Sequence, residues 1–240
     1  MINIVRYEDL GRANYGWLDA RYHFSFAGSY NPERMGFGAL RVVNDDSVAP
    51  GAGFPTHPHR DMEIITYVRQ GAITHADDQG NQGRTEAGDV QVMSAGRGIQ
   101  HSEMNLESVE TKLYQIWIFP NKRSVNPHWE THKFPKVPVK DSLPLLVAGD
   151  GSAPLAINQD AYIYAGRLAS DASVVHSIKH QAYILIAEGE IEVQAKGASE
   201  TVNKGDAIEV TKESEITLSA NTESEVLIID VPDAAHRARR

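Results

Sequence analysis

The 240-residue chain contains no cysteine, which excludes a disulfide framework, thiolate metal ligands and a cysteine nucleophile. It also lacks a hydrophobic run approaching the roughly 20 residues that a membrane-spanning helix needs. Its first residues show no basic region followed by a long apolar core, so no secretory signal is visible. From these absences we expect a cytoplasmic protein without a membrane partner.

Positive charge is also in short supply. The sequence has 23 basic and 32 acidic residues, which gives a formal net charge of −9. Because no basic field would attract phosphates, we expect no direct binding to nucleic acid, whereas a protein partner is compatible with this charge. The length is sufficient for one large or two small domains with a substantial core.

A long helical period is the third absence. Short apolar segments with alternating or β-branched residues are separated by turn residues, as in 21–26, 62–68 and 113–119. The densest turn cluster covers residues 77–83. This pattern predicts an all-β protein.

Two short phrases rich in histidine are present. His57 and His59 are followed by Glu63, and His101 is followed two residues later by Glu103. Residues two apart on a strand point to the same face, so we expect His57, His59 and Glu63 to share one face. The same rule puts His101 and Glu103 on one face. If both segments line a barrel, their nitrogen and oxygen ligands suit Fe(II), Mn(II), Ni(II), Cu(II) or Zn(II).

Glycines surround both phrases at fixed offsets, as they do at turns and corners of all-β chains. The first phrase fits G-x5-H-x-H-x3-E-x6-G, with one extra residue before the last glycine, through Gly51, His57, His59, Glu63 and Gly71. The second fits G-x5-P-x-G-x2-H-x3-N, with serine for proline and two extra residues, through Gly88, Ser94, His101 and Asn105. This combination resembles the two motifs of the cupin proteins.

Within the cupins, the phrases HPHRDMEIITYV and MSAGRGIQHSEMN resemble the pirin family. The N-terminal segments ANYGWLDARYHFSF and YNPERMGFGALRVVNDD are similar to pirin-like bacterial bicupins. The resemblance covers essentially the whole chain; it is dense over residues 11–119 and thin afterwards. It implies two tandem cupin barrels of the double-stranded β-helix, or jelly-roll, type.

An internal repeat also indicates two barrels. The segments around Gly71 and Gly88 recur around Gly189 and Gly205, with glycine spacings of 17 and 16 residues. We therefore expect an N-terminal metal-binding barrel over 1–125, a proline-rich linker over 126–143, a degenerate barrel without metal over 144–232 and a tail over 233–240. The tail, which contains His236, is assigned no role.

The remaining histidines are interpreted as structural. In the second repeat the doublet is replaced by a segment with His176, and His180 follows four residues later without a third ligand. His23 stands on a predicted strand without a partner nearby in sequence. His128 and His132 lie in the linker, where nothing else indicates a site. One metal ion per chain is therefore expected.

The pirin resemblance implies a different fourth ligand from that of most cupins. In most cupins the glutamate that matches Glu63 binds the metal, whereas in pirins the residue that matches Glu103 does so. We therefore assign the metal to His57, His59, His101 and Glu103, with Fe(II) first and Mn, Ni, Cu or Zn as alternatives. Glu103 is also a candidate catalytic base, and Glu63 a second catalytic carboxylate that orients an imidazole N–H.

A six-coordinate metal with these ligands keeps two open positions, which suit an organic substrate and O2. Pirin-like bacterial bicupins resemble quercetin 2,3-dioxygenases. The resemblance therefore implies a metal-dependent dioxygenase that cleaves a flavonol such as quercetin at the 2,3 bond with O2 and releases CO. The substrate is expected to be a small aromatic or phenolic molecule, with Phe24, Gln115 and Trp117 lining its pocket.

Three alternatives stay open on the sequence. The protein could be a metal- or redox-sensing regulatory pirin that acts through protein partners. It could be a cupin isomerase or decarboxylase, which dependence on oxygen would distinguish from a dioxygenase. A metal that only stabilises the barrel is the third; a closed structural site needs no spare carboxylate, and this chain has both Glu63 and Glu103.

Overall fold

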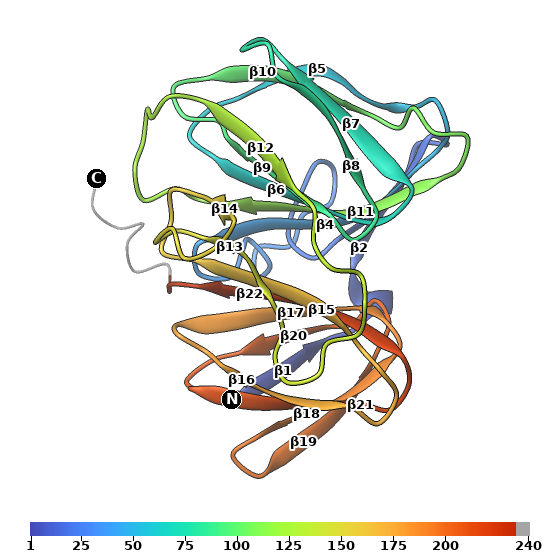
Figure 1. The fold of residues 1–240 in the computed structure, drawn as a ribbon, viewed down its shortest axis with the longest axis vertical. Helices are drawn as coiled ribbons and strands as arrows, with labels where there is room; N and C mark the ends of the chain where they lie inside the picture. The colour runs from blue at the N-terminus through green and yellow to red at the C-terminus, as the bar shows by residue number, and fades with distance from the viewer. Residues whose placement is uncertain (234–240) are drawn as a thin grey trace. The chain divides into compact units, whose positions relative to one another are not determined.

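The computed structural model describes residues 1–233 (Figure 1). Residues 234–240, which hold His236 and most of the expected tail, lie outside the described residues. Strands make up the described secondary structure apart from one short 3-10 helix, η1 (Tyr7–Asp9). The expected all-β class with two cupin-type barrels is confirmed. Among residues 1–233, no helix is long and apolar enough to cross a membrane.

The chain divides into two compact units. The first barrel comprises Leu10–Pro135 and Gly149–Gln159 and contains both histidine phrases. Its strands are β2 (Gly11–Asn14), β3 (Leu18–Tyr22), β4 (Leu40–Val48), β5 (Gly53–His59), β6 (Glu63–Gln70), β7 (Ala72–Asp77), β8 (Gln82–Glu86), β9 (Val90–Ser94), β10 (Ile99–Met104), β11 (Thr111–Ile118), β12 (His128–His132) and β14 (Leu155–Ala156).

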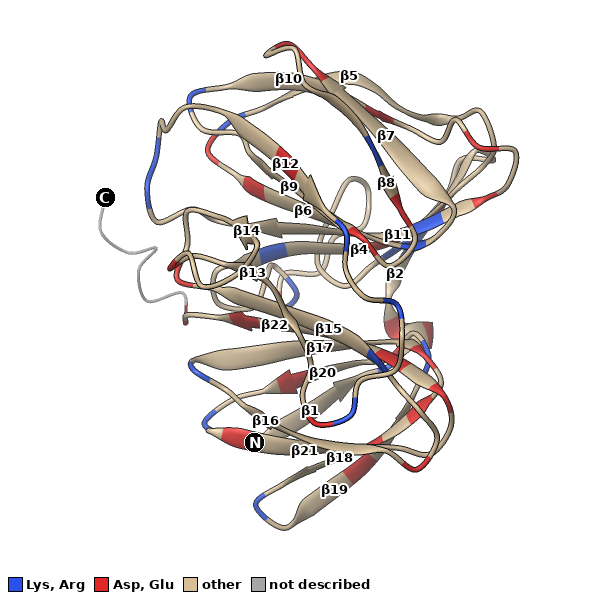
Figure 2. Cartoon of the chain, viewed as in Figure 1, with Lys and Arg blue, Asp and Glu red and all other residues tan. Residues whose placement is uncertain are grey.

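The second barrel comprises Met1–Asp9, Lys136–Ala148 and the described chain from Asp160 to residue 233. Its strands are β1 (Ile2–Val5), β13 (Leu145–Ala148), β15 (Tyr162–Leu168), β16 (Ser173–Ser177), β17 (Gln181–Glu188), β18 (Glu190–Ala195), β19 (Ala198–Asn203), β20 (Ala207–Val210), β21 (Glu215–Ala220) and β22 (Ser224–Val231). In Figure 2, basic and acidic segments are interspersed along the strands and loops of both units.

The unit boundaries differ from those expected on sequence. The first strand, β1, pairs with β20, so residues 1–9 belong to the second barrel instead of the first. Residues 128–132 of the expected linker form β12, which pairs with β9. Prolines argued against a central strand there, and β12 is the outermost strand of its sheet, with Pro127 and Pro135 outside its bounds.

The strand orders of the two barrels correspond. In the first barrel the large sheet runs β12-β9-β6-β11-β4-β3-β2 and the small sheet β5-β10-β7-β8. In the second, the strands of the large sheet that belong to this unit run in the order β1-β20-β17-β22-β15-β13, and the small sheet runs β16-β21-β18-β19. This correspondence is the structural form of the glycine repeat in the sequence.

The interior of the first barrel contains a polar row. Asn44, Gln115, Thr66 and Gln91 are consecutive cross-strand partners on β4, β11, β6 and β9. All four side chains are buried. Directly paired residues on neighbouring strands share a face, so this row crosses the inner surface of the large sheet. It lies opposite β10 of the small sheet, whose Glu103 it contacts.

Candidate metal centre

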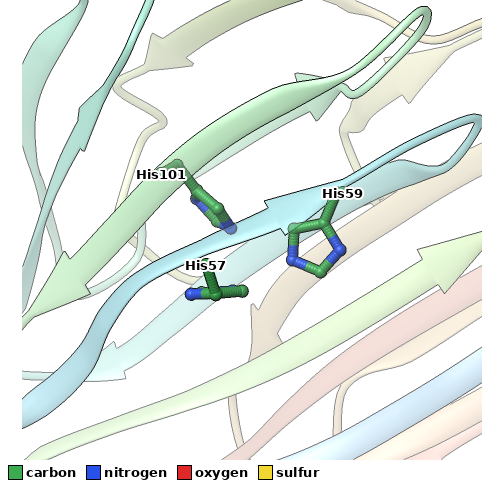
Figure 3. Close-up of side chains that lie close together, drawn as sticks. All are labelled: His57, His59 and His101. Atoms are coloured by element: carbon green, nitrogen blue, oxygen red, sulfur yellow. The ribbon is translucent and has the colours of Figure 1, made fainter.

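Three imidazoles converge in the first barrel. His57 and His59 project from β5 and His101 from the adjacent β10, where His101 pairs directly with His57 (Figure 3). One ring nitrogen of each histidine belongs to a group of atoms that all lie within 4.8 Å of one another. The ring centroids are 4.5 Å apart for His57 and His101, 4.8 Å for His57 and His59, and 5.0 Å for His59 and His101.

Close packing of β5 against β10 depends on a residue without a side chain. Gly53 begins β5, and a Cβ atom there would lie 2.3 Å from the carbonyl oxygen of Glu103. The small residue therefore lets the two histidine-bearing strands pair without a backbone collision. This is a local reason why the sequence can bring His57 and His101 together.

Burial keeps His59 and His101 neutral. Burial, followed by the neighbouring His57 and His59, lowers the pKa of His101 to about 2. Burial and then His57 lower the pKa of His59 to about 4. A neutral imidazole has a lone pair to offer, whereas a protonated one has none, so His59 and His101 are available as ligands at pH 7.

On two of the rings the hydrogen-bond pattern leaves the Nε2 atom without a partner among the described residues. The Nδ1 atom of His57 lies 2.8 Å from the carbonyl oxygen of Pro55 and can only donate to it, which leaves Nε2 with the lone pair. The Nε2 atom of His101 is buried and has no hydrogen-bond partner among residues 1–233. An orphaned buried nitrogen beside two other imidazoles fits a divalent transition metal.

Glu103 lies behind the histidines in the polar row. The Gln91 amide donates to its Oε1 at 2.6 Å, the Gln115 amide to its Oε2 at 2.6 Å, and the Thr66 hydroxyl to Oε1 at 3.0 Å. Both carboxylate oxygens therefore have a hydrogen-bond donor inside the barrel. The group of possible ligand atoms that lie within 4.8 Å of one another contains ring nitrogens of the three histidines and no oxygen of Glu103. Glu103 and His101 share the inner face of β10, as the alternation predicted.

The expectation that Glu63 shares a face with His57 and His59 is wrong. Asp61 adopts φ +48° between β5 and β6, so the alternation does not continue from His59 to Glu63. Glu63 projects from the face of β6 opposite to Thr66. There its carboxylate accepts hydrogen bonds from Ser94 at 2.6 Å and from Asn158 at 3.3 Å. Burial raises its pKa, and these hydrogen bonds partly offset that effect.

Sequence reasoning missed a fourth histidine, His75, which is fully buried beside His101. The Nδ1 atom of His75 on β7 lies 3.4 Å from Nδ1 of His101, and its Nε2 lies 2.9 Å from a carboxylate oxygen of Asp77. His75 and Asp77 are two residues apart just before the turn cluster, and this alternation could have placed both on one face. The polar partners of Glu103 were also missed, apart from Gln115, because cross-strand register is not visible in the sequence.

Aromatic rings adjoin the centre; Trp117 and Phe26 are half-buried and Tyr22 is buried. Trp117 packs edge-on against His59 at 4.9 Å, Phe26 against Trp117 at 5.5 Å, and Tyr22 against Phe26 at 5.5 Å. Trp117, which the sequence proposed as a pocket residue, therefore lies beside a candidate ligand. Phe24 instead packs under the guanidinium of Arg34, 5.0 Å from its ring centroid.

The other histidines lie outside this group of nitrogens. His23 is buried, and burial followed by nearby arginines lowers its pKa to about 3. His128 faces Glu130 on its own strand at 3.4 Å. In the second barrel, His176 packs edge-on against Tyr164, and His180 lies 3.1 Å from Asp160. Within residues 1–233, His57, His59 and His101 form the one candidate metal group.

Comparisons with known proteins agree with this picture. The family model Pirin matches residues 5–118, and the model for the quercetinase C-terminal cupin domain matches residues 145–231. A quercetin 2,3-dioxygenase of Escherichia coli K12 is 42% identical over 235 residues, covering 97% of this chain and 99% of that protein. A Pseudomonas aeruginosa protein, named provisionally for the same activity, is 49% identical over 235 residues, covering 96% and 100%.

Solved structures extend the likeness to three dimensions. The crystal structure of YhhW from Escherichia coli has a TM-score of 0.90 and 39% identity, covering 97% of this chain and 98% of that one. A structure of the same bacterial pirin in complex with nickel(II) has a TM-score of 0.88, covering 97% and 100%. With relatives of this identity over nearly its whole length, the chain belongs to the pirin family of cupin proteins.

Proposed function

We propose that this protein is a metal-dependent dioxygenase that cleaves a flavonol such as quercetin at the 2,3 bond with O2 and releases CO. The observation that carries the proposal is the convergence of three imidazoles, with His57 and His59 half-buried and His101 fully buried. The half-buried side gives small molecules a route to the centre. The activity named for the Escherichia coli relative supports the substrate class.

The proposed ligands are His57, His59, His101 and Glu103, with Fe(II) as the first choice of metal. The nickel(II) complex of the Escherichia coli pirin shows that a homologous protein accepts a borderline divalent ion. Such a metal would lower the pKa of a coordinated enol or phenol and hold the substrate and O2 at one centre. Three imidazoles and one carboxylate leave positions for both.

Glu103 is proposed to act also as the base. Its inner-face position on β10 puts it beside His101, and burial excludes water that would otherwise compete for the substrate proton. The amides of Gln91 and Gln115 donate to the two oxygens and so orient the carboxylate. Glu103 would take the proton of the flavonol 3-hydroxyl and return it as the product forms.

The aromatic side chains beside the centre suit a planar, phenolic substrate. Trp117 and Phe26 present an edge-to-face pair next to His59, and both are half-buried. Aromatic rings gain packing and quadrupole interactions from such neighbours, whereas a small aliphatic acid would leave them uncovered. We therefore place the flavonol rings against Trp117 and Phe26.

The decisive experiment measures O2 uptake by the Fe(II)-loaded protein with quercetin, together with CO in the headspace. We expect equimolar O2 loss and CO release from the wild type and from Glu63→Gln, and neither from His101→Ala. The Glu63 variant is the matched control, since that carboxylate bonds Ser94 and Asn158 on the other face of β6.

Absence of O2 uptake while metal is demonstrably bound, repeated with Mn(II), Ni(II) and Cu(II), would overturn the proposal. Conversion of an enolisable substrate without O2 would then favour an isomerase or decarboxylase. A change of protein-partner affinity between Fe(II) and Fe(III) would favour the regulatory alternative.

A further inference from the structure

The second ring nitrogen of His101 faces the protein interior instead of solvent. Its Nδ1 atom lies 3.4 Å from Nδ1 of His75, and the Nε2 atom of His75 lies 2.9 Å from Oδ2 of Asp77. Both side chains come from β7, the strand that pairs with β10 on the side away from β5. The three groups form a continuous line that ends at the ring of His101, whose other nitrogen, Nε2, has no partner among residues 1–233.

The hydrogen positions along this line follow from donor and acceptor chemistry. Two ring nitrogens attract each other only when one carries a hydrogen and the other a lone pair. The Asp77 carboxylate can only accept, so a His75 ring that carries a single hydrogen must hold it on Nε2. Nδ1 of His75 then accepts from Nδ1–H of His101, which leaves the lone pair of His101 on Nε2, the orphaned atom that faces the metal group.

The ring of His75 is also held in its plane. The indole of Trp129 stacks on it with a centroid distance of 4.8 Å and an interplanar angle of 8°. The residue paired with His75 across β8 is Gly83, and a Cβ atom there would lie 2.3 Å from Cη2 of Trp129. The stack thus depends on this glycine. His75 has no exposed surface, so water does not compete for its nitrogens.

The side chain of Asp77 is held by hydrogen bonds from the turn that follows β7. Its Oδ1 accepts from the backbone N–H of Gln79 and of Asn81, both at 3.0 Å, and the Asn81 amide donates to Oδ2 at 2.9 Å. Burial raises the pKa of Asp77, but the hydrogen bonds from His75 and Asn81 outweigh it and the net shift is downward. The turn cluster therefore holds the Asp77 carboxylate in place as an acceptor for His75.

We propose that His75 and Asp77 are a positioning pair that sets the tautomer and ring orientation of His101 and thereby raises the affinity of the site for its metal. The inference rests on the ligand assignment made under the proposed function, and not on the flavonol reaction. Hydrogen-bond partners of ligating histidines commonly change metal affinity by roughly 10- to 100-fold. The unusual feature here is that a second histidine stands between the ligand and the carboxylate.

The first test compares His75→Leu with His75→Asn by calorimetric titration of the full-length protein with Ni(II). The leucine removes the acceptor for His101, whereas the asparagine oxygen lies close to the position of Nδ1 and restores it. We expect a loss of about 10- to 100-fold in Ni(II) affinity for His75→Leu and recovery of most of it in His75→Asn. Wild-type affinity in His75→Leu would overturn the inference, as would an equal loss in both variants.

The second test reverses the hydrogen-bond direction. In Asp77→Asn the amide can donate to Nε2 of His75, which moves the ring hydrogen to Nδ1 and opposes the N–H of His101. We expect weaker Ni(II) binding than in Asn81→Ser, a matched variant that perturbs the same turn but leaves the carboxylate to His75. Equal affinity in the two variants would contradict the proposed direction. This test also serves if His75→Leu does not fold.

A spectroscopic readout separates positioning from mere stability. In the Co(II)-loaded wild type, the hyperfine-shifted N–H proton of His101 should exchange slowly with D2O, because His75 buries it. We expect this signal to exchange rapidly or vanish in His75→Leu and to persist in His75→Asn. Persistence of the slowly exchanging N–H signal in His75→Leu would contradict the inference. If His101→Ala also binds metal normally, the ligand assignment itself fails, a result distinct from failure of the pair.

Discussion

The two barrels share one strand order but fill their interiors with opposite chemistry. In the first barrel, one cross-strand row of the large sheet reads Asn44, Gln115, Thr66, Gln91 and Thr131. The row at the same place in the second barrel reads Tyr164, Ile228, Ile184, Ile208 and Ile4. Four polar residues have isoleucine as their counterpart, and the fold is the same.

The small sheets differ in the same way. His57 pairs with His101 in the first barrel, and His176 pairs with Ile216 in the second. Glu103 pairs with His75, and Leu218 with Val193. Of the histidine pair and the buried carboxylate, the second barrel therefore keeps one imidazole.

The contrast between the two interiors shows what a buried carboxylate requires. The interior of the second barrel is a continuous apolar cluster, which the hydrophobic effect stabilises directly. A carboxylate in such a cluster would be unpaired and strongly destabilising. The first barrel accommodates Glu103 only because three neighbouring side chains donate to it. The polar row is thus the supporting structure of the metal centre.

The largest expected effect comes from removing a ligand. His101→Ala should abolish metal binding almost completely, because a buried imidazole that faces two others is lost. His176→Ala is the matched variant in the second barrel and should bind metal like the wild type. Equilibrium dialysis against Ni(II) with metal analysis measures both. Retained metal in His101→Ala, or lost metal in His176→Ala, would contradict the assignment of the metal to the first barrel.

The two buried glutamates give the next largest effect. Glu103→Gln removes the proposed base and should lower kcat for flavonol cleavage by about 10²- to 10⁴-fold. Glu63→Gln should leave kcat and the bound metal close to wild type. Steady-state O2 uptake, normalised to metal content, measures both. A larger loss in Glu63→Gln than in Glu103→Gln would reverse the roles assigned to the two faces of the large sheet.

A reciprocal exchange tests the two interiors directly. Gln91→Ile removes a charge-assisted hydrogen bond to Glu103 and should lower the free energy of unfolding by about 1.5–3 kcal/mol. Ile208→Gln, at the same place in the second barrel, buries an amide among apolar residues and should cost roughly 1–3 kcal/mol.

Chemical denaturation reads the two changes separately. All three tryptophans, Trp17, Trp117 and Trp129, belong to the first barrel, so their fluorescence reports Gln91→Ile. Far-UV circular dichroism reports both barrels. A neutral Ile208→Gln exchange would show that the second interior tolerates polarity, and would weaken the contrast between the barrels.

The smallest effect is one in which the barrels should behave alike. Burial lowers the pKa of His176 to about 4, as burial and His57 do for His59. In the unfolded chain the pKa of each histidine returns to about 6.5, so the unfolded state binds more protons than the folded state below that pH. The free energy of unfolding therefore falls as the pH drops from 6.5 toward 4, because each histidine is protonated first in the unfolded chain. Midpoints near 6.5 in an NMR titration of the metal-free protein would contradict this.

Much of the site was readable from local sequence. His57 and His59 are two residues apart on one strand, so their common direction needed only the period of a β-strand. The same holds for His101 and Glu103 on β10. The same rule fails for Glu63. The positive φ of Asp61 lies between β5 and β6, and β6 belongs to the large sheet instead of the small one. Alternation applies within a strand and not across a turn.

The all-β class, the repeat of two barrels and the three histidines that gather could be predicted from the sequence, since each depends on short-range periodicity or on glycines at turns. Tertiary structure alone decided which unit takes β1, which amides hold Glu103 and that His75 stands between His101 and Asp77. These are matters of cross-strand register. Register joins residues far apart in the chain, so the tertiary fold has to set it.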